Sequence, residues 1–229
     1  LFRSPRIAWH AAFIEAIRME LDQYRDVLEF KPEYPLTAEP LEIDMVIIKK
    51  APEIRIEKNI AWIFKTVNIV EFKSPTDYVS LHDFYKVYGY ACLYASLEHI
   101  PITDLTITFI ESRYPRELVR HLREVRSYTV EERGRGIYTV TGDIMPIQVI
   151  DSRKLSEGEN LWLRNLDNEL NVERIRRITG EIARAGKEAR IRAYVDAIMR
   201  ANAGMVEEAI RMSDVTLEQV FERTGLLAK

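Results

Sequence analysis

The chain has 229 residues, of which 47% are hydrophobic and 30% are charged, and this composition excludes a disordered or low-complexity protein. Its 33 basic and 36 acidic residues leave a net charge of −3, so any contact with a nucleic acid has to come from a local basic surface. A single cysteine, Cys92, excludes an intramolecular disulfide and is typical of a reducing compartment. No apolar run reaches the ~18 residues of a membrane span, which predicts a cytoplasmic protein with no membrane partner.

The hydrophobic pattern predicts helices and strands in alternation along the N-terminal half. The first element is an amphipathic helix over residues 7–28, ended by Pro32 and Pro35. Runs of β-branched residues indicate the strands, and prolines and glycines mark their ends. In chain order, the further expected elements are a strand over 41–49, a short edge or hairpin strand over 54–56, a short turn or helix over 59–65, a strand over 67–73, a helix over 81–97 capped by Ser80, a strand over 105–110 and a helix over 115–125.

The C-terminal part of the chain changes in character. Two β-like runs are expected between residues 128 and 150, with a hairpin turn at Gly134–Gly136, and from about Asn168 the pattern is helical. We therefore expect one domain over residues 1–160 and a helical C-terminal extension over 161–229. The order of the elements predicts an α/β fold, in which helices flank a central sheet.

Two carboxylates occur in strands that are otherwise apolar. Asp44 lies in the middle of its strand, and Glu71 shares one face of the next strand with Lys73 because side chains alternate. The same Glu-x-Lys spacing occurs at Glu29–Lys31, where a nearby proline makes a poor setting for a strand. A charge in such an apolar run either faces solvent or is paired around something, and the alternation of side chains leaves both interpretations open.

The first helix contributes a third acid. Glu20 falls on the apolar face of this helix with Trp9 and Phe13, whereas Glu15 falls among the charged residues and is expected to be solvated. Glu20 is then either a hydrogen-bonded core residue or part of one acidic cluster with the two strand carboxylates and their lysine. Three acids need a cation to coexist. Oxygen ligands without cysteine, and without histidines at ligand spacing, favour Mg²⁺ or Mn²⁺ over zinc.

These residues resemble a known superfamily. Glu20, an acid in an apolar strand, a Glu-x-Lys pair and a tyrosine-rich helix follow one another as in the PD-(D/E)XK nucleases. The chain is similar to the recombination-promoting nuclease and transposase-like branch of uncharacterised bacterial proteins. The segments that carry this narrower similarity are Trp9 with Glu20-Leu21, Ile43-Asp44, Ile48-Lys49-Lys50 and Glu71-Phe72-Lys73-Ser74-Pro75. The resemblance covers residues 7–110 well and the rest loosely.

The resemblance implies a restriction-endonuclease-like core with a mixed central sheet, and it implies roles for individual residues. Asp44, Glu71 and the Phe72 backbone carbonyl would bind Mg²⁺ or Mn²⁺. Glu20 would complete the acidic shell, directly or through a metal-bound water. Lys73 would position the attacking water and offset negative charge on the phosphate. Together, Glu20, Asp44, Glu71 and Lys73 are the expected catalytic set of a deoxyribonuclease.

The chain departs from the family pattern at two places. Ile43 replaces the proline before the aspartate, and Lys86 with Tyr90 stands where many members have Gln-x-x-x-Tyr. Lys86 could instead meet a backbone phosphate. A basic run over residues 173–192 is either a solvated helix face or a phosphate contact. The residues expected to bind nucleic acid are Ser74, Lys86, Tyr90, Arg176 and Arg177.

Several alternatives stay open at this stage. The fold could be kept as a non-catalytic module that binds nucleic acid or protein, or as a purely structural module. The sequence leaves open DNA against RNA, with DNA as the expected partner. It also leaves open whether a homodimer is needed to cut both strands.

Overall fold

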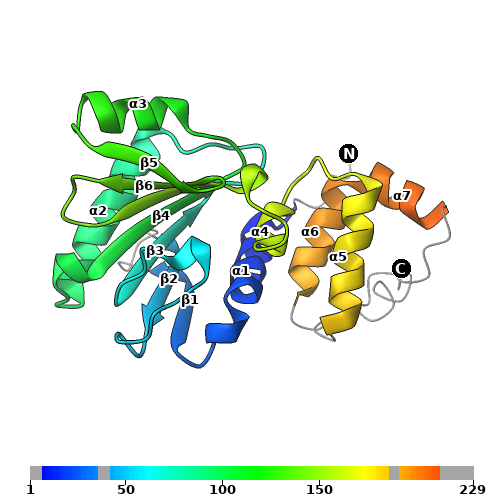
Figure 1. The fold of residues 1–229 in the computed structure, drawn as a ribbon, viewed down its shortest axis with the longest axis horizontal. Helices are drawn as coiled ribbons and strands as arrows, with labels where there is room; N and C mark the ends of the chain where they lie inside the picture. Colours follow the sequence, from blue (N-terminus) through cyan, green and yellow to red (C-terminus); the bar gives the residue numbers. More distant parts are fainter. Residues whose placement is uncertain (1–6, 36–41, 186–190, 212–229) are drawn as a thin grey trace. The chain divides into compact units, whose positions relative to one another are not determined.

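The structure is a computed structural model that describes residues 7–35, 42–185 and 191–211 (Figure 1). The chain divides into two compact units. The sheet unit is Leu21–Glu159, and the helical unit combines Leu1–Glu20 with Asn160–Lys229. None of the described helices is long and apolar enough to cross a membrane.

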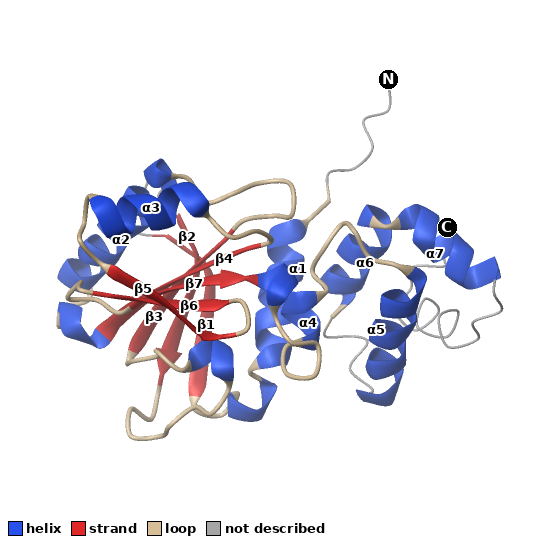
Figure 2. Ribbon diagram, turned by 45° about the horizontal axis from the view of Figure 1, so that its top comes forward, coloured by secondary structure: helices blue, strands red, loops and turns tan. Residues whose placement is uncertain are grey.

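One mixed sheet of seven strands organises the sheet unit (Figure 2). The strands are β1 (Leu28–Pro35), β2 (Glu42–Lys49), β3 (Val67–Phe72), β4 (Leu105–Glu111), β5 (Thr129–Gly134), β6 (Ile137–Thr141) and β7 (Ile147–Asp151), in the spatial order β1-β2-β3-β4-β7-β6-β5. The central strands β3, β4 and β7 are parallel, and every other neighbouring pair is antiparallel. This confirms the expected α/β fold with a mixed sheet.

Two helices cover one face of this sheet, α2 (Leu81–Leu97) and α3 (Arg116–Glu124). The apolar side of α2 buries Phe84 and Val87 against the inward side chains of β3 and β4, such as Phe109, whose ring centroid is 5.9 Å from that of Phe84. Residues of β3 and β4 are buried throughout, as expected of central parallel strands covered on both faces. Short 3₁₀ turns lie at Asp22–Tyr24, Asn59–Ala61, Ile102–Asp104 and Ser152–Lys154.

The sequence prediction was wrong at the first strand. Residues 21–28 do not continue the first helix, and the chain instead forms β1 along the edge of the sheet, antiparallel to β2. Pro32 is opposite Met45 in this pairing. A proline is tolerated there because an edge strand has one side without hydrogen-bonding partners. The Glu29–Lys31 tripeptide therefore lies in a strand after all.

Two further predictions were wrong. The segment 54–56 forms no strand, and the region between residues 128 and 150 contains β5, β6 and most of β7 rather than two strands. The hairpin turn between β5 and β6 is confirmed at Gly136, whose φ of +76° is readily accessible only to glycine. The remaining strands, the two helices of this unit and the short turn near Asn59 are confirmed, with Leu41 outside the described residues.

In its described residues, the helical unit contains α1 (Trp9–Glu20), α4 (Leu161–Arg164), α5 (Val172–Ala185), α6 (Arg192–Ala201) and α7 (Ala203–Arg211). Two carboxylates of α1 bind the first turns of other helices. Glu15 Oε2 accepts a hydrogen bond of 2.6 Å from the Tyr194 N–H in α6, so Glu15 is half-buried and not solvated. Backbone N–H groups at a helix start have no intrahelical partner, which explains why these acids bind there. The first helix thus groups with the C-terminal helices, whereas the sequence places it in a domain over 1–160.

Candidate active site

Asp44 and Glu71 come together where β2 and β3 end their pairing. The antiparallel ladder closes at Met45 and Val70, so Asp44 and Glu71 are the next residues on each strand. Asp44 Oδ2 accepts a hydrogen bond of 2.8 Å from the Phe72 N–H. The two carboxylates and the peptide of Phe72 therefore form one small region of oxygen atoms.

Glu71 is buried among charges of both signs, with its side chain 4% exposed. Its Oε1 lies 3.3 Å from Lys73 Nζ and 3.4 Å from Lys86 Nζ. Burial and the nearby charge of Asp44 raise the pKa of Glu71, against the opposing effect of the two lysines. Burial is the larger of the two causes, and the charge of Asp44 adds to it.

Lys73 is held as a cation by two carboxylates. Its Nζ donates to Asp83 Oδ1 at 2.8 Å, in addition to its contact with Glu71. Burial lowers the pKa of Lys73, but the hydrogen bond to Asp83 and the charge of Glu71 outweigh it, and the pKa is raised overall. These contacts favour the ammonium form of Lys73, which donates hydrogen bonds to its carboxylate partners.

Asp83 is the residue that the sequence interpretation missed. It stands in the first turn of α2, where Ser80 Oγ accepts from the Asp83 N–H at 3.1 Å and Asp83 Oδ2 accepts from the Ser80 N–H at 3.0 Å. This reciprocal capping box has the Ser-x-x-Asp spacing, which was readable in the sequence. Although burial raises the pKa of Asp83, hydrogen bonds from Lys73 and Ser80 lower it to about 2. Asp83 therefore connects the start of α2 to the site.

The residues expected to bind nucleic acid are divided between the two units. Lys86 is beside the site, where its Nζ lies 3.4 Å from Glu71 Oε1 and 5.9 Å from the ring centroid of Tyr90. Ser74 Oγ lies 3.3 Å from Thr76 Oγ1 in the loop that follows β3. The remaining two expected residues, Arg176 and Arg177, belong to α5 of the helical unit, and residues 186–190 of the basic run lie outside the described residues.

Glu20 belongs to the helical unit and binds backbone there. It is 6% exposed, and its Oε1 accepts hydrogen bonds from the N–H groups of Trp162 at 2.8 Å and Leu163 at 3.0 Å. Both donors are in the first turn of α4. This observation favours the hydrogen-bonded core residue, which the sequence left as the alternative to a metal ligand.

The oxygen atoms of the site suit a hard cation, although the expected three-acid group is not found. In the part of the chain that the structure describes, no group of three histidine, cysteine or acidic side chains is arranged to hold a metal ion. Mg²⁺ commonly takes one or two carboxylates and completes its shell with water and substrate. Asp44 and Glu71 match that smaller set, and their mutual repulsion is what a cation would relieve.

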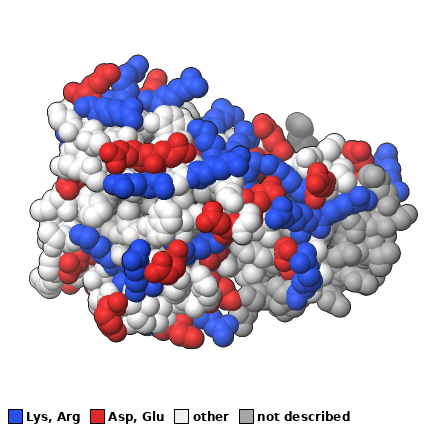
Figure 3. Space-filling model, viewed as in Figure 1, with Lys and Arg blue, Asp and Glu red and all other residues white. Residues whose placement is uncertain are grey.

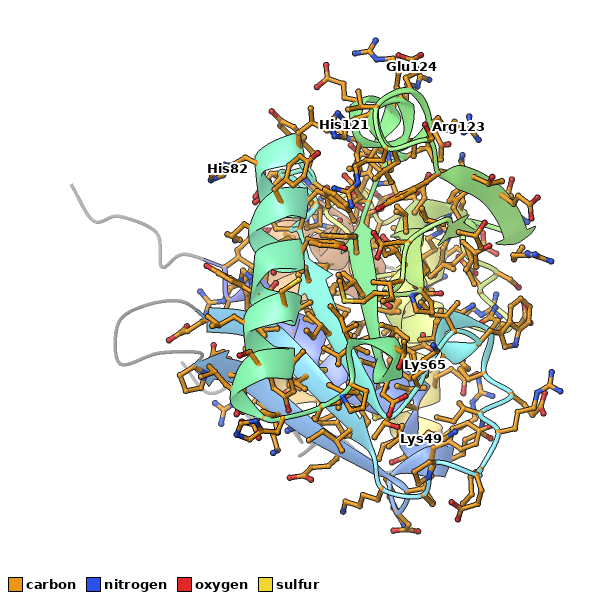
Figure 4. The ribbon with its side chains drawn as sticks, turned by 90° about the vertical axis from the view of Figure 1, so that its left-hand side faces the viewer. Lys49, Lys65, His82, His121, Arg123 and Glu124 are labelled. Atoms are coloured by element: carbon orange, nitrogen blue, oxygen red, sulfur yellow. The ribbon has the colours of Figure 1, made fainter. Side chains whose placement is uncertain are left out.

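The site lies at the end of β3 from which the chain enters α2. Figure 4 shows His82 at this end of α2, with Lys49 and Lys65 at the opposite end of the sheet. His82 points away from the sheet, and His121 of α3 bonds to Tyr85 at 2.7 Å. These two histidines therefore take no part in the site. Over the face of the sheet unit in Figure 3, Lys and Arg are interspersed with Asp and Glu rather than gathered into one broad basic surface.

No family model, no curated protein and no solved structure matches this chain.

Proposed function

We propose that this protein is a metal-dependent nuclease that hydrolyses phosphodiester bonds of DNA, with a site of the PD-(D/E)XK type. The observation that carries the proposal is the convergence of Asp44, Glu71 and Lys73 from two strands. These are the three residues that the resemblance assigns to metal binding and to the attacking water. The mixed sheet supports the same proposal. Strands β1, β2 and β3 pair antiparallel, whereas β3 and β4, which α2 connects along the chain, pair parallel.

The residues of the site have complementary tasks in this proposal. Asp44, Glu71 and the Phe72 carbonyl hold Mg²⁺ or Mn²⁺, which, when bound, supplies a Lewis acid for the phosphate and a water of lowered pKa. Lys73, which stays charged, donates a hydrogen bond and offsets negative charge on the phosphate. Asp83 fixes the position of that ammonium group, and Lys86 is partly exposed beside it for a backbone phosphate.

Plasmid nicking tests the proposal. The purified full chain with Mg²⁺ or Mn²⁺ should convert supercoiled plasmid to the nicked form, and Asp44→Asn should abolish this conversion. Glu124→Gln is the matched control, because it also removes one carboxylate but lies on the exposed side of α3. The ratio of nicked to linear product reports whether one copy cuts alone or a homodimer cuts both strands.

The result also separates the alternative of a binding module. If wild type and Asp44→Asn give the same product in the presence of Mn²⁺, the nuclease proposal is wrong. DNA binding that survives Lys73→Ala and needs no divalent ion would then support a non-catalytic module.

A further inference from the structure

A second pair of carboxylates lies at the ends of two central strands. Glu111 ends β4 and Asp151 ends β7, and the two are direct partners in the parallel register. Both are almost completely buried, with 1% and 3% of their surface exposed. They are in one row with Lys73, because Phe72 pairs with Ile110 and the Lys73 N–H donates to the Ile110 carbonyl at 2.9 Å.

Each of these carboxylates has one oxygen without a partner. Glu111 Oε2 accepts from the Val79 N–H at 3.2 Å, and Asp151 Oδ2 lies 3.6 Å from Lys154 Nζ. The second oxygens, Glu111 Oε1 and Asp151 Oδ1, are buried and have no hydrogen-bond partner. Buried polar atoms are almost always paired in native proteins, and a carboxylate oxygen is costly to bury alone. Two such atoms on neighbouring strand ends are acceptors available to a ligand.

The groups nearby only partly compensate the pair. Burial raises the pKa of Asp151 and outweighs the charge of Lys154 and the hydrogen bonds from the backbone of Lys154 and Arg153, which lower it. The ammonium group of Lys154 also donates to the Tyr138 hydroxyl at 3.1 Å and lies over the ring of Tyr114 at 5.3 Å. Burial raises the pKa of Glu111 to about 8. The hydrogen bond from the Val79 N–H lowers this pKa, and the charge of Asp151 raises it further. Lys73 is the other cation that lowers it, but Lys73 is already engaged by the carboxylates of the first site.

We propose that Glu111 and Asp151 bind a divalent cation, Mg²⁺ or Mn²⁺, at a site separate from that of Asp44 and Glu71. The ligands are the two unpartnered oxygens, Glu111 Oε1 and Asp151 Oδ1, and water completes the shell. Two carboxylates are a usual protein contribution to a Mg²⁺ site, and the carboxyl ends of parallel strands are a usual place for ligands in α/β proteins. The cation adds positive charge next to Lys73. The proposal does not depend on hydrolysis of DNA.

Counting bound Mn²⁺ tests the second site. The full chain is titrated with Mn²⁺ and free ion is followed by electron paramagnetic resonance, for the wild type, Asp44→Asn/Glu71→Gln, Glu111→Gln and Asp151→Asn. The exposed change Glu124→Gln is the matched control, and the thermal unfolding midpoint of each variant establishes that it is folded. The double variant should keep one ion per chain, and adding Glu111→Gln to it should remove that ion.

The outcomes distinguish this proposal from the proposed nuclease. The second site is supported if one Mn²⁺ ion is lost in Glu111→Gln and in Asp151→Asn but kept in the double variant and in the control. This holds even if the protein nicks no DNA. Unchanged Mn²⁺ binding in Glu111→Gln and Asp151→Asn overturns it, and the pair then shares a proton instead of a cation. If Glu111→Gln and Asp151→Asn do not fold, the test is made on the double variant Asp44→Asn/Glu71→Gln. An absence of bound Mn²⁺ in the folded double variant overturns the proposal.

Discussion

Replacing Asp83 by asparagine removes the charge that holds Lys73 in the site. Asp83 Oδ1 accepts from Lys73 Nζ at 2.8 Å, Lys86 Nζ is 4.0 Å away, and Oδ2 accepts from the Ser80 N–H at 3.0 Å. Asparagine has a single oxygen, so it can satisfy Lys73 or Ser80 but not both. We expect a less stable protein, together with a less well positioned Lys73.

The pKa of Asp83 sets the size of this effect. The native pKa is about 2 against an ordinary value of 3.8. At about 1.4 kcal/mol per pKa unit, this shift corresponds to about 2 kcal/mol, and partial exposure of the side chain reduces it to about 1–2 kcal/mol. Because the folded-state pKa is depressed, this stability is present above 3.8 and is lost as the pH falls towards 2. Two other acids lie near Lys73, Glu71 and Glu111, and the pKa of each is raised rather than lowered, so neither accounts for a loss of stability in this window.

Urea denaturation measures the free energy of unfolding across this window. At about pH 7 the variant Asp83→Asn should be less stable than wild type by about 1–2 kcal/mol, and the difference should shrink towards about pH 3. Ser80→Ala is the comparison variant, because it removes the cap at a cost of about 1 kcal/mol, together with one hydrogen bond that lowers the pKa of Asp83, but leaves the contact between Asp83 and Lys73, so its pH dependence should be smaller. A difference between wild type and Asp83→Asn that stays constant with pH would show that the charge of Asp83 does not cause the loss of stability.

Three other predictions test the remaining structure. Glu20→Ala should lower the free energy of unfolding in urea by about 1–3 kcal/mol, because two backbone donors lose their acceptor, whereas Glu20→Gln keeps an acceptor. A loss of Mn²⁺ binding in folded Glu20→Gln would show that Glu20 is a metal ligand. Gly136→Ala should lower the unfolding midpoint, because the φ of Gly136 is +76° and an added Cβ would lie 2.7 Å from a backbone carbonyl oxygen. Its control, Gly89→Ala in the open middle of α2, should raise the free energy of unfolding by about 1 kcal/mol. Equal effects of the two changes would contradict the assigned turn. Asp143→Ala should lower the free energy of unfolding in urea by about 3 kcal/mol, because it leaves the partly buried Arg126 without the carboxylate that lies 3.2 Å away. A decrease of less than about 1 kcal/mol would show that the ion pair is solvated.

Much of the fold was predictable because local patterns specify local structure. The runs that became β2, β3 and β4 are apolar and β-branched, and α2 begins at the expected Ser80 cap. Asp44 and the Glu71–Lys73 pair were identified as charges out of place in apolar strands. The edge strand β1 was missed because prolines argue against a strand unless the strand is known to lie at an edge, which only strand pairing decides.

The long-range partners of the charged side chains depend on the tertiary structure. The sequence by itself determined an α/β protein with an acid in one strand and a Glu-x-Lys pair in the next. It could not show that Glu20 binds the start of α4, that Asp83 holds Lys73, or that Glu111 is beside Asp151. The physical reason is that side-chain periodicity identifies the face on which a residue lies, whereas its neighbours across parallel strands and at helix starts depend on connections and register that no local pattern encodes.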